Sequence, residues 1–198
     1  IRRTYGYSQD DFLLFYAAEF NKNINQQLLL NAFVKVKDEV SNARLLLAGD
    51  GPLLEQCKGL ATKLGIEEHV DFLGLRNDVE LLVKMSDLAV ASSLREGLPV
   101  NIMEAMSCGL PVVATENRGH RELVRNNENG FIYNSLDVGQ FASKIIELAQ
   151  SEYMRNKLGR TSRQLIEQNY GVTNVLDQKS MIYRRYMKEM EELKWVAH

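Results

Sequence analysis

Two carboxylates, Glu96 and Glu104, lie eight residues apart around the start of a short predicted helix. A carboxylate on a helix with otherwise apolar surroundings is costly unless a partner pairs with it, and a polar ligand in an open cleft would supply that partner. The simpler interpretation is that Glu104 is a surface helix former and that Glu96 complements the helix dipole. The loop between them favours the ligand-binding interpretation.

This helix is predicted to run from about Pro99 to Ser107 and to begin without a side-chain cap. Pro suits the first helical position, and Leu98 at the N-cap position offers no oxygen to a backbone N–H. A helix start without a cap is free to bind an anion such as phosphate. Gly109 and Pro111 mark the end of the helix.

Apolar residues dominate the same helix, so we expect it to be buried on most sides. The polar residues Asn101, Glu104 and Ser107 are spaced by three and form one stripe. Apolar runs on either side, Leu88–Ala91 and Val112–Ala114, predict strands. The whole stretch therefore predicts a strand, a loop, a helix and a strand, as in one turn of a βαβ unit.

Strand-like and helix-like segments alternate along most of the chain. The alternation predicts an α/β fold, a Rossmann-like doubly wound parallel sheet of about six strands with helices on both faces and a helical C-terminal segment. We expect residues 1–170 to form one domain and 171–198 a C-terminal helix. The predicted strands are 11–18, 44–49, 70–73, 88–91, 112–114 and 130–133.

Ligands of such sheets bind at the carboxyl ends of the strands. Five residues fall just past predicted strand ends and are expected to surround one cleft: Glu19, Gly49, Gly74, Glu96 and Glu116. The sequence contains no Gly-x-Gly-x-x-Gly motif, so a dinucleotide site is not expected.

Composition excludes several classes of function. The net charge of −2 gives no reason to expect nucleic acid as a partner. Two cysteines make no disulfide framework and fit a reducing cytoplasm, where we expect the protein. No apolar run approaches the length of a transmembrane helix. The chain starts at Ile1, which suggests an excised fragment.

The central stretch closely resembles the Glu-x7-Glu region of retaining GT-B glycosyltransferases, family 4 (group 1). The resemblance rests on Glu96-Gly-Leu-Pro and on Glu104-Ala-Met-Ser-Cys-Gly-Leu-Pro-Val-Val-Ala-Thr115. It implies that Glu96 contacts the transferred sugar and is catalytic, and that Glu104 binds the ribose hydroxyls of the nucleotide. The diphosphate would then face the loop and helix start formed by Gly97, Leu98, Pro99, Val100 and Asn101.

The resemblance extends over nearly the whole chain. Val70-Asp-Phe-Leu-Gly-Leu-Arg76 is similar to the segment that contacts the nucleotide base, which implies a donor contact for Arg76. The segments Glu19–Asn25, Arg76–Asp78 and Arg118–Arg121 resemble the subgroup found in capsule and exopolysaccharide synthesis. The resemblance implies that the chain is only the C-terminal, donor-binding half of such an enzyme.

The sequence departs from the family pattern at the positions of two cations that would neutralise the diphosphate. Many members of the family place an Arg and a Lys, five residues apart, on the first loop, and here those positions hold Glu19 and Ile24. Lys22 in the same loop could supply the charge, or it could be a solvated loop cation. Alternatively, Arg118 could reach in from another loop.

The resemblance implies the donor half of a retaining transferase that uses a nucleotide-sugar, expected to be UDP-linked, for surface polysaccharide synthesis. No cofactor or metal is expected, because the sequence has no Asp-x-Asp. The acceptor, a glycan or a lipid-linked acceptor, would be bound by a missing N-terminal half, which could also contact the membrane peripherally. The fragment alone would then be inactive.

Two other functions stay open. One is a non-catalytic nucleotide-sugar-binding or assembly module, favoured by Glu19 and Ile24. The other is a sugar-phosphate enzyme of similar fold, such as a phosphorylase or epimerase. The helix of 171–198 is expected to pack back toward the missing half with an apolar surface that includes Tyr186, Met190 and Trp195. His120 is expected on a surface loop near the rim of the cleft.

Overall fold

The computed structural model describes residues 1–171 and Met181. Ile1–Arg163 forms one compact unit, and Gln164–His198 is grouped as a second unit. Apart from Gly171 and Met181, the predicted C-terminal helix of 171–198 lies outside the described residues, as do Tyr186, Met190 and Trp195. The predicted domain boundary after residue 170 therefore stays a prediction.

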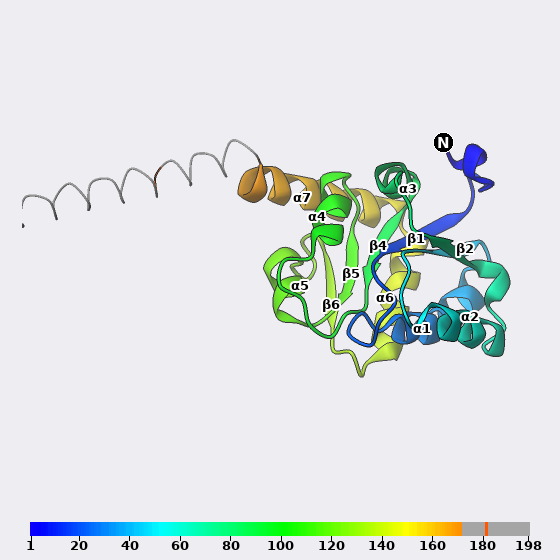
Figure 1. Ribbon diagram of the computed structural model, residues 1–198. Helices are drawn as coiled ribbons and strands as arrows, with labels where there is room; N and C mark the ends of the chain where they lie inside the picture. Colours follow the sequence, from blue (N-terminus) through cyan, green and yellow to red (C-terminus); the bar gives the residue numbers. More distant parts are fainter. Residues whose placement is uncertain (172–180, 182–198) are drawn as a thin grey trace, which may run out of the picture. The chain divides into compact units, whose positions relative to one another are not determined.

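A parallel six-stranded sheet forms the centre of the first unit (Figure 1). Its strand order is β3-β2-β1-β4-β5-β6, and every neighbouring pair is parallel. This confirms the predicted doubly wound architecture with its six strands. The strands are β1 (Phe12–Ala17), β2 (Ala43–Ala48), β3 (Val70–Gly74), β4 (Leu88–Ala91), β5 (Val112–Thr115) and β6 (Gly130–Tyr133).

Helices cover both faces of this sheet. α1, α2 and α6 pack together on one face, and α3 and α4 lie on the other (Figure 1). The α-helices are α1 (Gln26–Glu39), α2 (Leu54–Lys63), α3 (Val79–Met85), α4 (Val100–Ser107), α5 (Arg118–Leu123), α6 (Val138–Gln150) and α7 (Glu152–Tyr170), and two 3-10 turns are η1 (Arg2–Tyr5) and η2 (Glu67–His69). The expectation of a loop at Arg118–Arg121 is wrong, since these residues begin α5.

Burial of the central strands explains why they appear as continuous apolar runs in the sequence. The first five residues of β1 are buried, because this strand has neighbours on both sides and helices on both faces. Helix α6 contributes a regular apolar stripe to the same core through Phe141, Ala142, Ile145 and Leu148.

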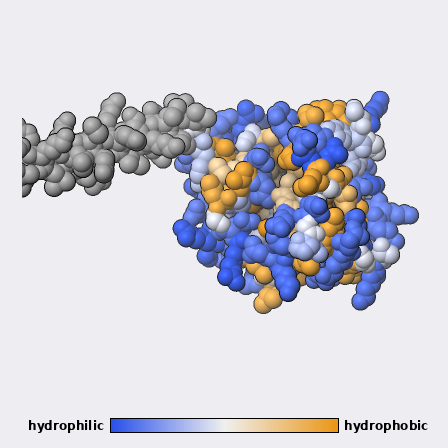
Figure 2. Space-filling view, viewed as in Figure 1, coloured by the Kyte–Doolittle hydropathy of each residue, from blue (hydrophilic) through white to orange (hydrophobic). Residues whose placement is uncertain are grey.

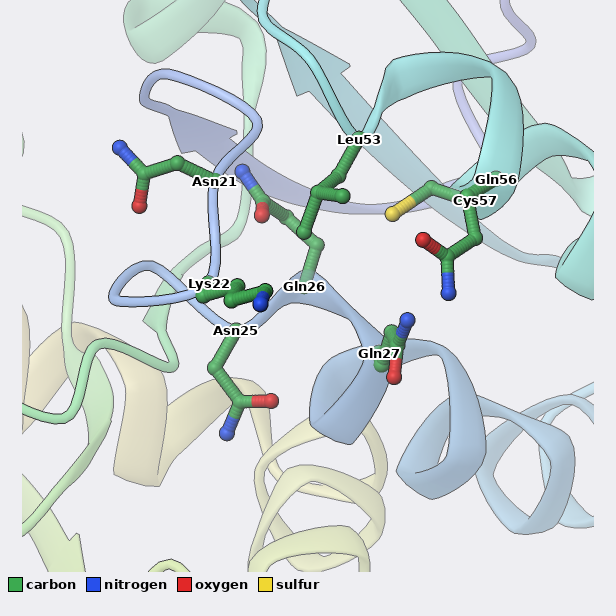
Figure 3. Close-up of a pocket in the computed structure, with 8 residues that line it drawn as sticks. All are labelled: Asn21, Lys22, Asn25, Gln26, Gln27, Leu53, Gln56 and Cys57. Atoms are coloured by element: carbon green, nitrogen blue, oxygen red, sulfur yellow. The ribbon is translucent and has the colours of Figure 1, made fainter.

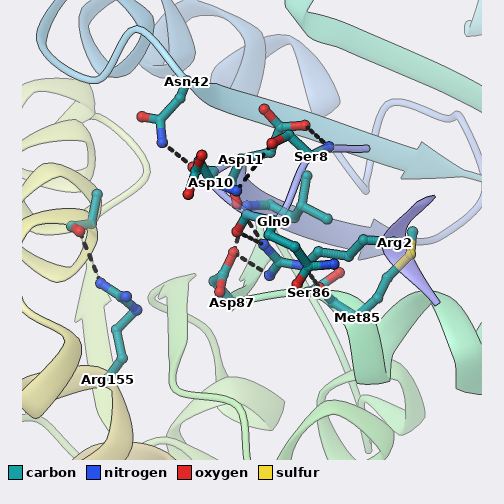
Figure 4. A network of polar contacts seen from close by, with 12 residues as sticks. Arg2, Ser8, Gln9, Asp10, Asp11, Asn42, Met85, Ser86, Asp87 and Arg155 are labelled. Atoms are coloured by element: carbon teal, nitrogen blue, oxygen red, sulfur yellow. Dashed lines mark hydrogen bonds and ion pairs between the residues drawn. The ribbon is translucent and has the colours of Figure 1, made fainter. Parts of the chain in front are cut away.

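The N-terminal segment is fixed to the amino ends of the strands by Arg2 (Figure 4). The Arg2 guanidinium donates to Asp87 Oδ2 at 2.8 Å and to the carbonyl oxygen of Met85 at 2.9 Å. Asp87 Oδ2 also accepts the backbone N–H of Leu13 on β1 at 2.8 Å. This network lies at the opposite edge of the sheet from the loops that follow the strands. Among the described helices, none is long and apolar enough to cross a membrane.

Candidate functional site

The strand order makes the point between β1 and β4 the topological switch point of the sheet. β1 connects through α1 to β2 on one side, while the strands after β4 continue on the other side, so the chain connections run in opposite directions from this point. Ligands of doubly wound sheets bind at such a switch point. The loop after β4 carries Glu96, and the loop after β1 runs from Ala18 to Asn25.

Helix α4 begins one residue later than expected. Its N-cap is Pro99, not Leu98, and no side chain caps this start, in agreement with the predicted uncapped helix. Ile102 N–H is satisfied locally, by Asn101 Oδ1 at 2.9 Å. The Asn101 side chain also donates to the carbonyl oxygen of Ala17 at 3.0 Å, which ties the helix start to the end of β1.

The expectation that α4 is buried on most sides is wrong. Ile102, Ala105 and Met106 are buried, whereas Val100 is 59% exposed. One face of the helix packs on β4 and β5, and its start projects from the sheet. Leu98 and Val100 are among the large apolar side chains that reach the surface, and Figure 2 shows such apolar groups interspersed with polar ones.

Glu104 is exposed on the predicted polar stripe of α4, and Glu96 is partly exposed in the loop before the helix. Glu104 borders a cavity of about 610 Å³ between α3 and α4. The other lining residues are Val79, Glu80, Val83, Lys84, Ser107, Cys108 and Arg163. Both carboxylates are therefore accessible to a ligand.

The loop of Glu96 packs directly against the start of α5. A β-carbon added to Gly119 would lie 2.4 Å from the carbonyl oxygen of Gly97 and 2.9 Å from the β-carbon of Glu96. Only a glycine allows this approach of two backbones. Arg118, the first residue of α5, therefore lies beside the loop, and its side chain is 86% exposed.

Behind the loop, a buried polar network surrounds Ser93. The Ser93 carbonyl oxygen accepts the Thr115 hydroxyl at 2.6 Å and the Asn117 side-chain amide at 3.0 Å. His120 Nδ1 lies 2.6 Å from the carbonyl oxygen of Thr115, so this nitrogen carries the proton. His120 Nε2 then accepts the Ser93 hydroxyl at 3.1 Å. The network joins the ends of β4 and β5 just before Glu96.

His120 is therefore a buried residue of α5, and the expectation of a surface loop position is wrong. Burial lowers the pKa of its imidazole, and the hydrogen bond to Thr115 opposes this shift only in part. Asn117 caps α5 by accepting the His120 N–H at 2.9 Å. An Asn just before a helix is a recognisable N-cap signal, and Asn117 could have been identified from the sequence.

Tyr16 on β1 was also not singled out from the sequence. Its hydroxyl is buried and has no hydrogen-bond partner in the described part of the chain.

Arg76 lies at the edge of the sheet, beyond β3, and binds its own neighbour. Its guanidinium donates two hydrogen bonds to Asp78, at 2.8 and 2.6 Å, and the Tyr5 hydroxyl donates to the same carboxylate at 2.5 Å. These bonds lower the pKa of Asp78 to about 2. Arg76 follows β3 at the carboxyl edge of the sheet, and these hydrogen bonds join it to Asp78.

Lys22 does not point to the start of α4. It lines a separate polar cavity of about 260 Å³ at the beginnings of α1 and α2 (Figure 3). There, Gln27 and Gln56 direct their amides toward the same space from the two helices (Figure 3). Ile24 is buried, so the position at which the family resemblance leads us to expect a Lys faces the protein interior. Within the described residues, no group of three or more His, Cys, Asp or Glu could hold a metal ion.

Comparisons with known proteins agree with this arrangement. The sequence profile of the family described as "Glycosyl transferases group 1" matches residues 1–165. EpsD of Bacillus subtilis, a protein classed as a glycosyltransferase, is 38% identical over 187 residues, which cover 94% of this chain and 49% of EpsD. The N-acetyl-alpha-D-glucosaminyl L-malate synthase of Bacillus anthracis is 30% identical over 189 residues, which cover 96% of this chain and 49% of the synthase.

A solved structure shares the fold. HepE of Anabaena, crystallised with UDP and glucose, superposes with a TM-score of 0.83 at 26% identity, over 93% of this chain and 51% of HepE. This chain thus spans about half the length of the relatives it matches. The profile match over residues 1–165 shows that the chain belongs to the group 1 glycosyltransferase family and has the Rossmann-like architecture of its GT-B members.

Proposed function

We propose that this chain binds the nucleotide-sugar donor of a retaining family 4 glycosyltransferase, and that the donor is UDP-linked. The observation that carries the proposal is the open start of α4 at the switch point, with Glu96 before it and Glu104 one turn beyond it. HepE, which has the same fold, was crystallised with UDP and glucose, and this supports the choice of nucleotide.

The proposed roles follow from the positions of the residues. The diphosphate lies at the start of α4, where the backbone N–H groups of Gly97, Leu98, Val100 and Asn101 and the helix dipole favour an anion. Pro99 has no N–H, and it shapes the turn into the helix. Glu104 lies four residues beyond Val100, about 6 Å along the axis, which suits a ribose joined to that diphosphate.

Glu96 contacts the transferred sugar in this proposal and acts in the reaction. The chemistry replaces the bond from the anomeric carbon to the diphosphate by a bond to an acceptor hydroxyl, with retention of configuration. Negative charge develops on the leaving diphosphate, and donors fixed at the helix start stabilise it. The proposal includes no divalent metal, because the sequence has no Asp-x-Asp.

The acceptor site belongs, in this proposal, to the half of the relatives that this chain does not span. A transfer needs the acceptor hydroxyl held about 3 to 3.5 Å from the reacting carbon. The residues assigned above all face the donor, so the chain alone is proposed to bind donor without transferring sugar. The proposed acceptor is a glycan or a lipid-linked acceptor of surface polysaccharide synthesis at the cytoplasmic side of the membrane.

A panel of nucleotides and nucleotide-sugars tests the choice of ligand by thermal shift, because a ligand that binds only the folded state raises the melting temperature. UDP and UDP-sugars should raise it more than adenine or guanine nucleotides do. An equal shift with all nucleotides, or none with UDP, would contradict the proposal.

A non-catalytic donor-binding module is the second candidate, and the first loop favours it. Glu19 is a carboxylate in a loop that carries cations in many relatives, and Ile24 is buried. Turnover of a nucleotide-sugar by the full-length parent separates the two candidates. Donor binding without turnover in the complete protein would support the module.

A further inference from the structure

Asn23 joins the loop after β1 to the loop that carries Glu96. Its carbonyl oxygen accepts the N–H of Leu94 at 2.8 Å. Its side chain binds both backbone groups of Arg95, since Nδ2 donates to the carbonyl oxygen at 2.9 Å and Oδ1 accepts the N–H at 3.1 Å. One side chain thus holds the residue immediately before Glu96 at both of its polar backbone groups.

A second bond ties the same two loops together at a deeper point. The Ser92 hydroxyl donates to the carbonyl oxygen of Ile24 at 2.7 Å, and both Ser92 and Ile24 are buried. This bond fixes the base of the Glu96 loop, whereas Asn23 is exposed and acts two to three residues further along. The backbone between Ser92 and Glu96 is therefore attached to the first loop at successive points.

The opposite side of the Glu96 loop is held by α5. Gly119 lies against the backbone of Gly97, and Asn117 and His120 bind Ser93. Without the Asn23 side chain, the loop would be anchored only on this side, at its base and by the bond from Leu94 N–H to the backbone carbonyl oxygen of residue 23. Loops of this kind are usually mobile on their exposed side, where backbone groups bind water instead.

The position of the Glu96 carboxylate depends on these contacts between the two loops and α5. A group that must meet a substrate within a few tenths of an ångström needs supporting residues that fix its backbone. In this chain the first loop supplies such support but no cation, because Ile24 is buried and Lys22 lines another cavity. Its contribution to the donor site is therefore geometric.

We propose that Asn23 is a positioning residue that sets Glu96 against the transferred sugar of the donor. The inference rests on the proposed function, because Asn23 acts only through Glu96. It separates two contributions of the site: the nucleotide is held by α4, and the sugar by a loop that Asn23 fixes.

A double-mutant cycle with Asn23→Ala and Glu96→Gln tests this coupling. Calorimetry measures the affinities for UDP and for the tightest of UDP-glucose, UDP-galactose and UDP-N-acetylglucosamine. Asn23→Ala should lower the affinity for the UDP-sugar about fivefold, the effect of losing typical hydrogen bonds, and should change that for UDP less than twofold. In the Glu96→Gln background, Asn23→Ala should have no further effect.

Asn42→Ala is the matched control, because the Asn42 side chain also binds a backbone carbonyl oxygen, that of Asp10, at the opposite edge of the sheet. It should leave both affinities unchanged. Equal losses for UDP and UDP-sugar on Asn23→Ala, or additive losses in the double variant, would show a general structural role and overturn the inference.

The remaining outcomes separate this inference from the proposed function. If UDP binds and none of the three UDP-sugars binds more tightly than UDP, no sugar contact exists for Asn23 to set, and the inference fails alone. If the unaltered chain does not bind UDP, the proposed function fails with it.

Discussion

Gly119 packs so closely against Gly97 that a β-carbon added to Gly119 would lie only 2.4 Å from the carbonyl oxygen of Gly97. The start of α5 and the loop before α4 are therefore in contact through their backbones. This contact explains why a short helix of six residues matters for the candidate site. It also makes the position of Glu96 sensitive to a single methyl group.

Gly119→Ala should displace the Glu96 loop and destabilise the fold by about 1 to 3 kcal/mol, the usual cost of overpacking. Gly139→Ala is the matched control, since Gly139 is also the second residue of its helix and a β-carbon there would meet only Asp137 Oδ1 at 3.9 Å. That variant should be neutral or slightly stabilising. Urea unfolding of both variants measures the difference, and equal stabilities would contradict the contact.

The two carboxylates should differ in their effect on UDP. Glu104→Gln removes the proposed charged partner of the ribose and should lower the affinity for UDP roughly tenfold or more. Glu96→Gln should leave UDP affinity unchanged, because UDP lacks the sugar that Glu96 is proposed to contact. Calorimetry with UDP compares the variants, and equal losses would refute the division of roles.

Neutralisation of the diphosphate charge should depend on Arg118 more than on Lys22. Arg118 is the first residue of α5, next to Gly119, which packs against Gly97, and its ion pair with Glu122 is long, at 3.6 Å. Lys22 faces the cavity between α1 and α2. Arg118→Gln should weaken UDP roughly three- to tenfold, as expected for an exposed ion pair or a somewhat stronger one.

Two substitutions control for a general loss of positive charge. Lys22→Gln and Arg121→Gln should change UDP affinity less than twofold, and Arg121 already binds Glu116 at 3.1 Å. A larger effect of Lys22→Gln than of Arg118→Gln would return the role to the first loop. A larger effect of substituting Arg95, which adjoins Glu96, would assign the charge to that residue instead.

His120 should make the stability depend on pH in the weakly acidic range. Its pKa in the folded chain is lowered below the ordinary 6.5 because the imidazole is buried, so the unfolded chain binds the proton more readily. The free energy of unfolding is therefore highest above pH 6.5 and falls as pH drops from 6.5 toward the lower pKa of the folded chain.

Urea unfolding at pH 7.5 and 5.5 measures this dependence. His120→Asn should reduce it, whereas His69→Gln, at a histidine whose ring is hydrogen-bonded to the carbonyl oxygen of Ala43, should keep it. Stability that rises as pH falls through this range, or that changes equally in the His120 variant, would argue against a buried neutral imidazole.

Much of the fold follows from hydrophobic patterning. β4 and β6 have the predicted bounds, and the other strands differ by one or two residues, because buried parallel strands are short apolar runs bounded by polar or glycine residues. α5 was missed, since six residues span fewer than two turns and show no periodicity. Its N-cap, Asn117, was the signal that could have revealed it.

The candidate site was less predictable than the fold. The sequence placed Glu96 and Glu104 around one helix start, since both belong to one short continuous stretch that contains the start of α4. It could not place Lys22 and Arg76, whose directions depend on the neighbours at the ends of other strands. The bonds of Asn23 to Arg95 join residues 72 positions apart, and only the order of strands in the sheet brings them together.

The most direct test of the account is a calorimetric titration of this chain with UDP in the presence of EDTA. The account predicts saturable binding with one site, and the same affinity when excess Mg²⁺ replaces the chelator. Absence of UDP binding, or binding that appears only after a divalent metal is restored, would contradict the assignment of the α4 start as a metal-independent diphosphate site.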